Sequence, residues 1–334
     1  MEVCFSPSVR PQRLKELFRS FPFHEIRLRI EHSMKKEVSH GLETFLQQVI
    51  NGLSLGSVYA LIAVGYSLVY SILLFSNFAH GGFLVVGGYA CYAALKALGA
   101  NIWIASAMSL VGAGIVAVMT ERLAYKPIRE RTNVTLYLLI ASMGMSIVIE
   151  NLFVIFVGGR FRALPPVIPT SPVSLFGLAT TSAFDLLSLV ASVVFLGALQ
   201  IFLLRTKWGL AIRAAAYDLR TAGLMGVNVN LLVSIVFFVA GALAAVGGIF
   251  LSVRYTLYPQ LGGITIKAFV AAVIGGLGSL PGAVVGSIIL GLAEMLTAGF
   301  ISSQLRDLVV FSLLVITLLV KPSGLFGKNV SEKV

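Results

Sequence analysis

Charge is scarce in this chain. Only 12% of its 334 residues are Asp, Glu, Lys or Arg, about half the share usual in soluble globular domains. Hydrophobic residues make up 57% of the chain, and so few charges cannot cover so much apolar surface in water. The composition therefore excludes a soluble globular domain and predicts a polytopic membrane protein.

Cysteine and histidine are also rare, which argues against redox and metal chemistry. The two cysteines, Cys4 and Cys91, lie in a polar N-terminal tail and in an apolar run, so no disulfide framework is indicated. The four histidines form no ligand cluster. The chain also lacks a phosphate-binding Gly-x-x-x-x-Gly-Lys-Ser/Thr loop and any paired-carboxylate, Cys/His or Ser/His/Asp arrangement. We therefore expect no cofactor, no metal and no enzymatic activity.

The excess of positive charge has an explanation in the membrane. Lys and Arg outnumber Asp and Glu by 25 to 14, for a net charge of +11. These basic residues lie in short runs between apolar segments, where the positive-inside rule accounts for them. We interpret them as topology signals and expect no nucleic-acid partner.

Apolar runs long enough to cross a bilayer recur along the chain, since a span needs about 20 apolar residues. The predicted spans are Phe45–Tyr70, Phe78–Leu98, Ile102–Leu123, Val134–Val157, Phe184–Leu204, Leu231–Val253, the Gly-rich stretch Ala268–Phe300, and Leu308–Val320. The sequence thus predicts an all-α polytopic membrane protein. We expect about eight to nine transmembrane helices, Gly-interrupted broken segments included.

The Gly-rich stretch is too long for one span, and Gly275–Gly282 in its middle cannot continue a regular helix. The basic loops at Arg122–Arg131, Arg205–Arg220 and Lys321–Lys333 should all be cytoplasmic. Two loops on the same side must be joined by an even number of membrane crossings. The Gly-rich stretch must therefore enter the membrane and return, as a hairpin or as two half-helices. The same parity places the N-terminus and the connection Gly158–Ser182 outside.

Residues 1–41 differ from the rest because they are polar and lack the apolar core of a signal peptide. Met34, followed by two lysines, resembles an ordinary start, so we expect residues 1–41 to be a disordered extension or a mis-annotated start. The alternative is an amphipathic segment at Arg10–Ile30 on a membrane surface. The predicted domains are this extension, a transmembrane domain at 42–327 and a cytoplasmic tail at 328–334.

Two stretches, one in each half of the chain, share a pattern of glycines within an apolar segment. The first begins at Ser76-Asn77 and the second at Gly275-Gly276. Corresponding broken segments in two halves indicate a translocation path. The path candidates are Asn77, His80, Gly81, Gly275, Gly276, Gly278, Pro281 and Glu294. The alternative for Asn77 and His80 is that they satisfy backbone groups freed by the first break.

Carboxylates inside apolar runs are functional candidates by default. Glu150 and Glu294 lie in such runs. We interpret Glu150 as a structural polar contact and leave Glu294 open between a functional group and a hydrogen-bonded interior carboxylate. Lys267 is expected to anchor at the interface with its stem buried, and Tyr66 to belong to an aromatic belt or to packing.

A short basic, Ala-rich segment at Arg205–Arg220 interrupts the apolar sequence on the predicted cytoplasmic side. Its composition favours a helix, and Gly223, Gly226 and Asn228 close it. A helix presented there is most simply a docking surface for a soluble partner. The alternative is that its arginines only set topology.

Four motifs that contain polar residues carry a family resemblance. They are Asn77-Phe78-Ala79-His80-Gly81, the segment Gly209–Asn228 with its Arg213-Ala214-x-Ala216-x-Asp218 core, Lys267-Ala268-Phe269 leading into Gly275–Ala283, and Gly291-Leu292-Ala293-Glu294. In order and spacing they resemble the LivH-type permeases of high-affinity branched-chain amino acid ABC transporters. The resemblance runs from Thr44 to Gly327.

The resemblance implies an ABC importer permease fold in the cytoplasmic (inner) membrane of a bacterium or archaeon, with leucine, isoleucine or valine as substrate. It implies as partners two cytoplasmic ABC ATPase subunits that hydrolyse ATP, a second homologous permease subunit, an external or periplasmic substrate-binding protein, and the lipid bilayer. The stretch from Arg213 to Gly223 would be the coupling helix. Its ATPase contacts would be Arg213, Ala215, Asp218, Arg220, Gly223, Gly226 and Asn228.

Other functions stay open at this point. The path candidates do not select leucine over urea, a short amide or another amino acid. A secondary transporter that works without an ATPase would need ion-coupling residues in the core; only Glu150 and Glu294 qualify, and the basic cytoplasmic helix would have no task. A membrane-embedded enzyme lacks any catalytic arrangement.

Overall fold

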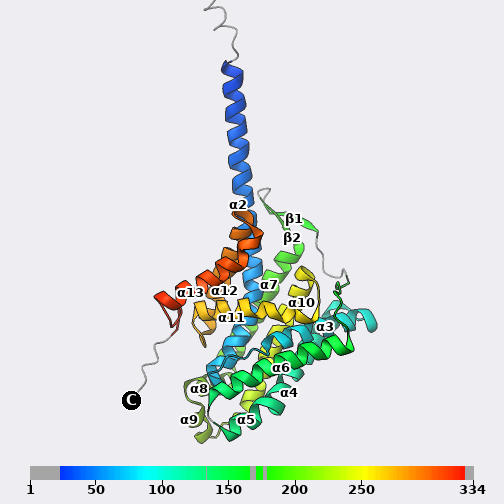
Figure 1. The fold of residues 1–334 in the computed structure, drawn as a ribbon, viewed down its shortest axis with the longest axis vertical. Helices are drawn as coiled ribbons and strands as arrows, with labels where there is room; N and C mark the ends of the chain where they lie inside the picture. The colour runs from blue at the N-terminus through cyan, green and yellow to red at the C-terminus, as the bar shows by residue number, and fades with distance from the viewer. Residues whose placement is uncertain (1–22, 133, 166–170, 176–178, 328–334) are drawn as a thin grey trace, which may run out of the picture. The chain divides into compact units, whose positions relative to one another are not determined.

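The structure is a computed structural model that describes residues 23–132, 134–165, 171–175 and 179–327 (Figure 1). The chain divides into two compact units, Met1–Leu46 and Gln47–Val334. Residues 1–22 of the predicted extension and the predicted tail 328–334 lie outside the described residues. Residues 23–41 are helical and form the first part of α2.

Helices make up most of the second unit, as the composition predicts. They are α2 (Phe23–Leu73, which begins in the first unit), α3 (His80–Ala97), α4 (Ile102–Thr120), the π-helix η1 (Glu121–Tyr125), α5 (Lys126–Arg131), α6 (Thr135–Phe156), α7 (Ala183–Arg205), α8 (Lys207–Tyr217), α9 (Leu219–Leu224), α10 (Val229–Tyr255), the 3-10 helix η2 (Pro259–Ile264), α11 (Thr265–Gly275), α12 (Leu280–Phe300), the 3-10 helix η3 (Ser303–Leu305) and α13 (Arg306–Val320). Strands β1 (Pro172–Leu175) and β2 (Ala179–Ser182) pair antiparallel, with Pro172 opposite Ser182.

Within the described residues, seven helical segments are long and apolar enough to cross a membrane. They are Gly41–Leu73, Ile102–Arg131, Thr135–Phe156, Ala183–Arg205, Val229–Tyr255, Leu280–Phe300 and Ser303–Val320. This confirms the all-α polytopic membrane fold. The count is lower than the expected eight to nine because α3 is diluted by four glycines, His80 and Lys96, and because α11 has only 11 residues.

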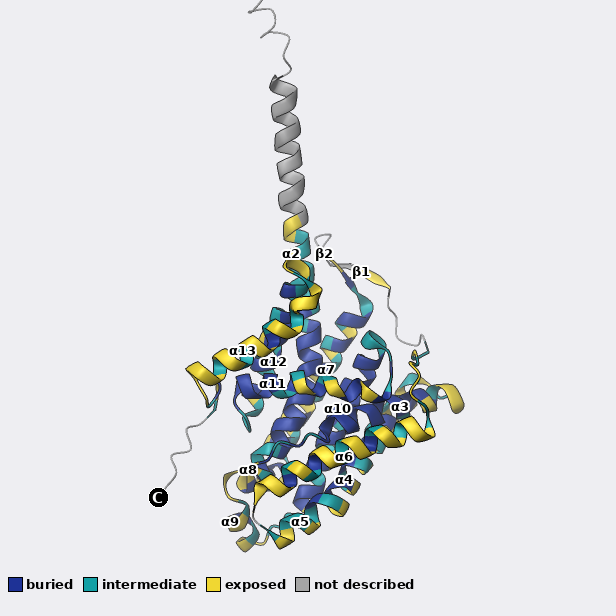
Figure 2. Ribbon diagram, viewed as in Figure 1, coloured by how far each residue is buried: buried dark blue, intermediate teal, exposed yellow. Residues whose placement is uncertain are grey.

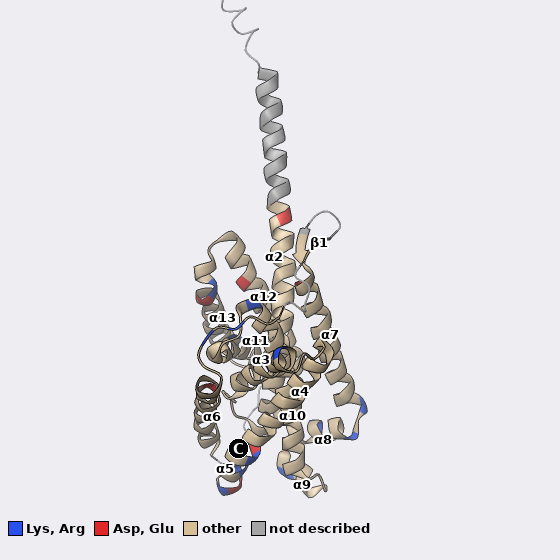
Figure 3. Cartoon of the chain, turned by 90° about the vertical axis from the view of Figure 1, so that its right-hand side faces the viewer, with Lys and Arg blue, Asp and Glu red and all other residues tan. Residues whose placement is uncertain are grey.

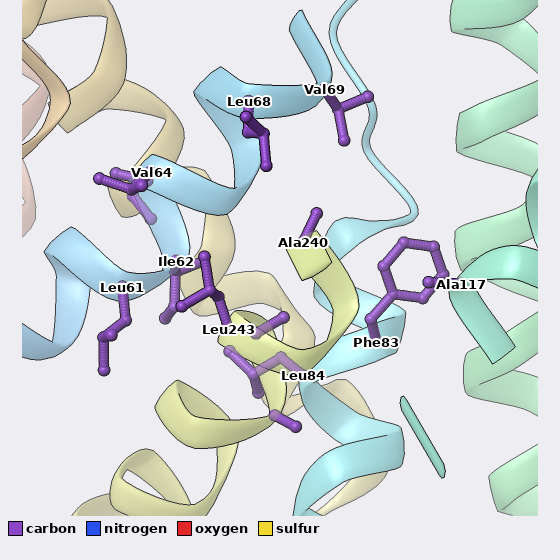
Figure 4. Close-up of a cluster of buried hydrophobic side chains, with 14 of the residues drawn as sticks. Leu61, Ile62, Val64, Leu68, Val69, Phe83, Leu84, Ala117, Ala240 and Leu243 are labelled. Carbon is purple, nitrogen blue, oxygen red and sulfur yellow. The ribbon is translucent and has the colours of Figure 1, made fainter. Parts of the chain in front are cut away.

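The core lies where α2, α3, α4 and α10 pack together. Figure 4 shows part of it, with side chains from all four helices: Leu61, Ile62, Val64, Leu68, Val69, Phe83, Leu84, Ala117, Ala240 and Leu243. Close contact depends on glycine, because a Cβ at Gly248 would lie 2.2 Å from the carbonyl oxygen of Leu84. Small residues of this kind let membrane helices approach each other closely.

The second Gly-rich stretch is a hairpin, which confirms the prediction from charge parity. Helix α11 ends at Gly275, and α12 starts at Leu280. Between them Gly276 and Gly278 have φ values of +105° and +82°, a region that favours glycine. Ser279 then caps α12 by accepting a hydrogen bond from the amide of the third residue along.

The first Gly-rich stretch differs from the prediction. The chain is non-helical at residues 74–79 and α3 begins at His80, so Gly81 and the glycines after it lie inside the helix. A Cβ at Gly81 would lie 2.5 Å from the carbonyl oxygen of Gly262 in η2. The glycines here allow close packing, and the break precedes them.

Many of the Lys and Arg residues lie at helix ends (Figure 3). Basic residues of α5, α8 and α9 share one end, which is the predicted cytoplasmic end. The β1–β2 hairpin precedes α7, and α8 follows it, so the 23-residue length of α7 separates the hairpin from the basic end. Strands β1 and β2, the described end of the connection predicted to lie outside, are thus at the opposite end from the basic helices, as charge parity predicts.

Candidate functional site

The basic cytoplasmic segment folds as two short helices rather than one. Helices α8 and α9 meet at Asp218, whose carboxylate accepts hydrogen bonds from the amides of Arg220 and Thr221 and from the Thr221 hydroxyl. Asp218 therefore caps α9. These bonds, that of the Thr221 hydroxyl foremost, lower the pKa of Asp218. Asp218, predicted as an ATPase contact, thus sets the turn between the two helices.

Helix α8 has an inward face. Gly209, Ile212 and Ala215, at a spacing of three residues, are buried. A Cβ at Gly209 would lie 2.3 Å from the carbonyl oxygen of Leu203 in α7. Ala215, predicted as an ATPase contact, is 2% exposed and packs inward in this chain. The spacing of these three residues is the sequence signal that could have shown it.

Much of α8 and α9 is exposed (Figure 2), and the exposed residues include basic and large apolar types. We call this the coupling surface, after the role predicted for the segment, and define it by its exposed residues, which are Trp208, Leu210, Arg213, Tyr217, Arg220, Leu224 and Met225. Tyr217 is 94% exposed and Leu224 88%. Single exposed apolar residues are ordinary, but a cluster of them marks an interaction site.

The other predicted coupling residues shape the turn into α10. Gly226 has a φ of +91°, which favours glycine. Asn228 caps α10 by accepting a hydrogen bond from the amide of Leu231. Gly223 is half-buried. These residues shape the connection between α9 and α10, the span that follows the coupling surface.

The predicted path residues of the first break are held by protein groups. The side-chain oxygen of Asn77 accepts a hydrogen bond from the Tyr125 hydroxyl at 2.8 Å. The His80 ring nitrogen lies 3.2 Å from the carbonyl oxygen of Ile62. Both side chains are almost wholly buried, and Gly81 packs on η2. The break is thus stabilised from within.

The glycines of the second break form a structural joint. A Cβ at Gly275 would lie 2.0 Å from the carbonyl oxygen of Gly282. The absence of a side chain at Gly275 therefore allows α11 and α12 to pack this closely. The chain after α13 closes the joint, because the amides of Leu325 and Phe326 donate to the carbonyls of Ile274 and Gly275. Pro281 lies in the first turn of α12, where a missing amide costs nothing.

Glu294, the remaining path candidate, belongs to a charged network at the opposite end from the coupling surface. Its carboxylate accepts a hydrogen bond from the Tyr59 hydroxyl at 3.1 Å and one from the Lys267 ammonium at 2.9 Å. Lys267 also pairs with Asp307 at 2.8 Å. Glu294 is 1% exposed. Lys267, expected as an interfacial anchor, thus bridges two carboxylates.

The environment of Glu150 differs from that of Glu294 and from the structural polar contact predicted from the sequence. Its carboxylate has no hydrogen bond or ion pair to any residue that the structure describes. It lines a cavity of about 300 Å³ together with Tyr66, Phe78, Met143, Ser146, Ile147, Gly262, Gly263, Thr265, Ile266 and Phe269. The hydroxyls of Tyr66 and Thr265 are buried and have no hydrogen-bond partner in the described chain. One signal was available: α6 contains no Lys or Arg to pair with Glu150.

These sites define a class of protein. The apolar spans, the broken hairpin and the exposed coupling surface are those of a multi-pass membrane transport subunit. Among the described residues no group of three His, Cys, Asp or Glu could hold a metal ion.

Comparisons with known proteins assign the chain to a family. Residues 48–318 match the family described as "Branched-chain amino acid transport system / permease component". The chain belongs to this family, which confirms the resemblance seen in its motifs.

Individual relatives agree. The chain is 40% identical over 304 residues to the high-affinity branched-chain amino acid transport system permease protein LivH of Escherichia coli (strain K12), covering 87% of this chain and 98% of that protein. It is 37% identical, with the same coverage, to BraD of Pseudomonas aeruginosa, which carries the same description. Among solved structures, PsaBC from Streptococcus pneumoniae in complex with Fab covers 83% of this chain and 92% of that chain, at 13% identity and a TM-score of 0.47.

Proposed function

We propose that this chain is the permease subunit of an ATP-driven importer of leucine, isoleucine and valine in the cytoplasmic membrane of a bacterium or archaeon. The observation that carries the proposal is 40% identity over 98% of LivH of Escherichia coli, a protein named for high-affinity branched-chain amino acid transport. The family match at residues 48–318 spans both breaks, the coupling surface and the charged network. Nothing in the comparisons favours urea, short amides or an importer that works without an ATPase.

ATP hydrolysis takes place in partner subunits in this proposal. Two cytoplasmic ATPases dock on the coupling surfaces of this chain and of a second, homologous permease subunit. Only Thr206 separates α7 from α8, and four residues separate α9 from α10. Movement of the docked ATPase therefore passes directly to two membrane spans.

The remaining partners meet other faces. Exposed large apolar residues on α4, α6 and α13, such as Trp103, Ile155 and Leu319, suit contact with lipid and with the second permease subunit. A substrate-binding protein delivers the amino acid at the end opposite the coupling surface.

The test is a charge reversal on the coupling surface. Arg213→Glu leaves every span untouched and puts a like charge against whatever acidic groups receive Arg213. We expect normal levels in the membrane, with co-purified ATPase and leucine uptake each reduced by about tenfold or more. The matched control is Arg160→Glu, the same change on an exposed arginine at the opposite end, where ATPase co-purification should not change.

Two results would contradict the proposal. If Arg213→Glu retains its ATPase subunits and transports normally, the surface is not the coupling site. If the assembled importer with unchanged permease takes up none of the three amino acids, the substrate is wrong.

A further inference from the structure

A groove between helices α3 and α6 combines an apolar lining with two basic side chains. We call it the α3–α6 groove. Its volume of about 600 Å³ is within the range of ligand sites. The lining comes from α3, from the end of α6 and from the connection that follows α6, and it consists of Val86, Tyr89, Ala90, Tyr92, Ala93, Lys96, Ala97, Phe153, Val157 and Arg162.

The groove reaches the end of the membrane domain that is opposite the coupling surface. Helix α4 leads towards the basic α5 and α6 leads away from it, so α3 and α6 both end on the side away from α5. Lys96 lies in the last turn of α3, and Arg162 follows shortly after Phe156, the last residue of α6. Both cations therefore lie where apolar helices leave the hydrocarbon and meet the lipid headgroups.

The positive-inside rule does not account for these two cations. That rule places an excess of Lys and Arg on the cytoplasmic side, whereas Lys96 and Arg162 lie at the other end. The lining of the groove contains no Asp or Glu. The ion pairs of the described chain all involve other basic residues. Two cations without a carboxylate partner, at headgroup depth, favour an anionic group from outside the chain.

Tyr92 brings the two cations together. The Lys96 ammonium donates to the Tyr92 hydroxyl at 3.0 Å, and both cations lie 5.5 Å from the centre of the Tyr92 ring. The backbone of Arg162 pairs with that of Leu257, and one guanidinium nitrogen donates to the Val157 carbonyl. Lys96 is exposed, and its ammonium has two further donors. Arg162 Nε is enclosed, but its second terminal nitrogen is neither enclosed nor hydrogen-bonded within the described chain.

The groove is apolar on the membrane side of the cations. The rings of Tyr89 and Phe153 stack there, with their centres 4.6 Å apart. Along α3 the lining runs from Val86 to Ala97, a length of about 16 Å at the rise of a helix. One leaflet contributes about half of a hydrocarbon core that is about 30 Å thick. The apolar part of the groove is thus long enough to follow an acyl chain through most of one leaflet.

We propose that the α3–α6 groove binds an anionic phospholipid of the outer leaflet, such as phosphatidylglycerol. Lys96 and Arg162 hold its phosphate, and the apolar lining holds one acyl chain. Phosphatidylcholine fits less well, because its quaternary ammonium adds a positive charge beside the two cations. The site requires only that the chain spans a membrane, so it does not depend on which substrate the importer carries.

The first experiment identifies the lipid that stays bound. The complete importer is reconstituted in vesicles of equal parts phosphatidylglycerol and phosphatidylcholine and extracted in detergent, and the permease with its retained lipid is weighed by native mass spectrometry. We expect phosphatidylglycerol to exceed phosphatidylcholine on the unchanged permease. The double variant Lys96→Gln with Arg162→Gln should retain several-fold less phosphatidylglycerol. Arg160→Gln is the matched control, because Arg160 is exposed in the same connection and does not line the groove, and it should retain the lipid fully.

The second experiment fills the apolar part and leaves both cations in place. Ala93 is exposed and lines the groove, so Ala93→Trp should lower the retained phosphatidylglycerol several-fold. Val148→Trp is the control, because Val148 is exposed on α6 outside the groove, and it should have no effect. Excess inorganic phosphate added during extraction separates the two possible sources of a phosphate group. It should leave the lipid bound, since the acyl chain contributes to binding.

Four results would overturn the proposal. The unchanged permease could retain the two lipids equally, or the double variant could retain phosphatidylglycerol as the unchanged permease does. Inorganic phosphate could displace the lipid, which would make the groove a site for free phosphate. Finally, Ala93→Trp could release the second permease subunit without changing the retained lipid, which would make the groove a protein interface. If the double variant does not accumulate in the membrane, Ala93→Trp decides, because its substitution is on an exposed position.

Discussion

Glu150 and Glu294 are the same residue type in similar apolar helices, yet the structure surrounds them differently. Glu294 is 1% exposed and accepts hydrogen bonds from Lys267 and Tyr59. Glu150 borders a cavity and has no such partner in the described chain. A buried charge that is paired has a structural role, because removal of its partner leaves the charge uncompensated and destabilises the protein. A carboxylate left open beside a cavity is available to a ligand.

The two sites also differ in what they connect. The Glu294 network ties α12 to α2 through Tyr59 and to α11 through Lys267. It holds the hairpin against the rest of the bundle. The Glu150 side chain ties α6 to no other residue that the structure describes. We therefore expect changes at the first site to affect stability and changes at the second to affect transport.

The largest effect on stability is expected from Lys267→Met. The substitution leaves the Glu294 carboxylate buried with only the Tyr59 hydroxyl as partner. Breaking a buried pair in this way costs about 3–5 kcal/mol. Thermal melting of the purified permease in detergent should shift strongly downward, and the level in the membrane should fall. A melting curve equal to that of the unchanged protein would show that the network does not stabilise the fold.

A second substitution should recover much of that loss. In Lys267→Met combined with Glu294→Gln, no charge is left buried, and the amide keeps a hydrogen-bond partner in Tyr59. Replacing a whole buried pair is often nearly neutral, so the double variant should be more stable than Lys267→Met by about 2 kcal/mol. Melting of the single and double variants side by side measures this coupling. Additive losses would mean that the two residues act independently.

The smallest effect on stability is expected from Glu150→Gln. Because Glu150 makes no hydrogen bond or ion pair to a described residue, the change should move the free energy of unfolding by less than about 0.5 kcal/mol. The same melting assay checks this. A shift as large as that of Lys267→Met would show that Glu150 belongs to the fold, and the comparison between the two carboxylates would fail.

Much of the fold could be predicted from local sequence. The spans follow from apolar runs of about 20 residues. The hairpin at Gly276 and Gly278 follows from glycines in an overlong apolar stretch, and from basic loops that must share one side. Both signals are local, because the cost of placing polar backbone or charge in lipid does not depend on which helices are neighbours.

The site could be predicted only in part. The sequence predicted a coupling role for the basic segment, and its predicted contacts included Ala215, which packs inward. It grouped Gly81 with Gly275 as parts of one path, whereas Gly81 packs on η2 and Gly275 on α12. Glycine looks alike in sequence whether it breaks a helix or allows two helices to touch, and only the neighbour across the contact distinguishes the roles.

By itself, then, the sequence determined that this chain crosses a membrane, which end is basic, where the apolar helices break and which family it resembles. Only the tertiary structure decided which carboxylate is paired and which is open. Lys267 is 27 residues from Glu294 in sequence, and Thr265 is more than a hundred residues from Glu150. Whether such groups meet depends on how α11 packs against α12 and how η2 packs against α6. That packing is a property of the assembled bundle, because it is set by contacts between distant helices and not by any one of them.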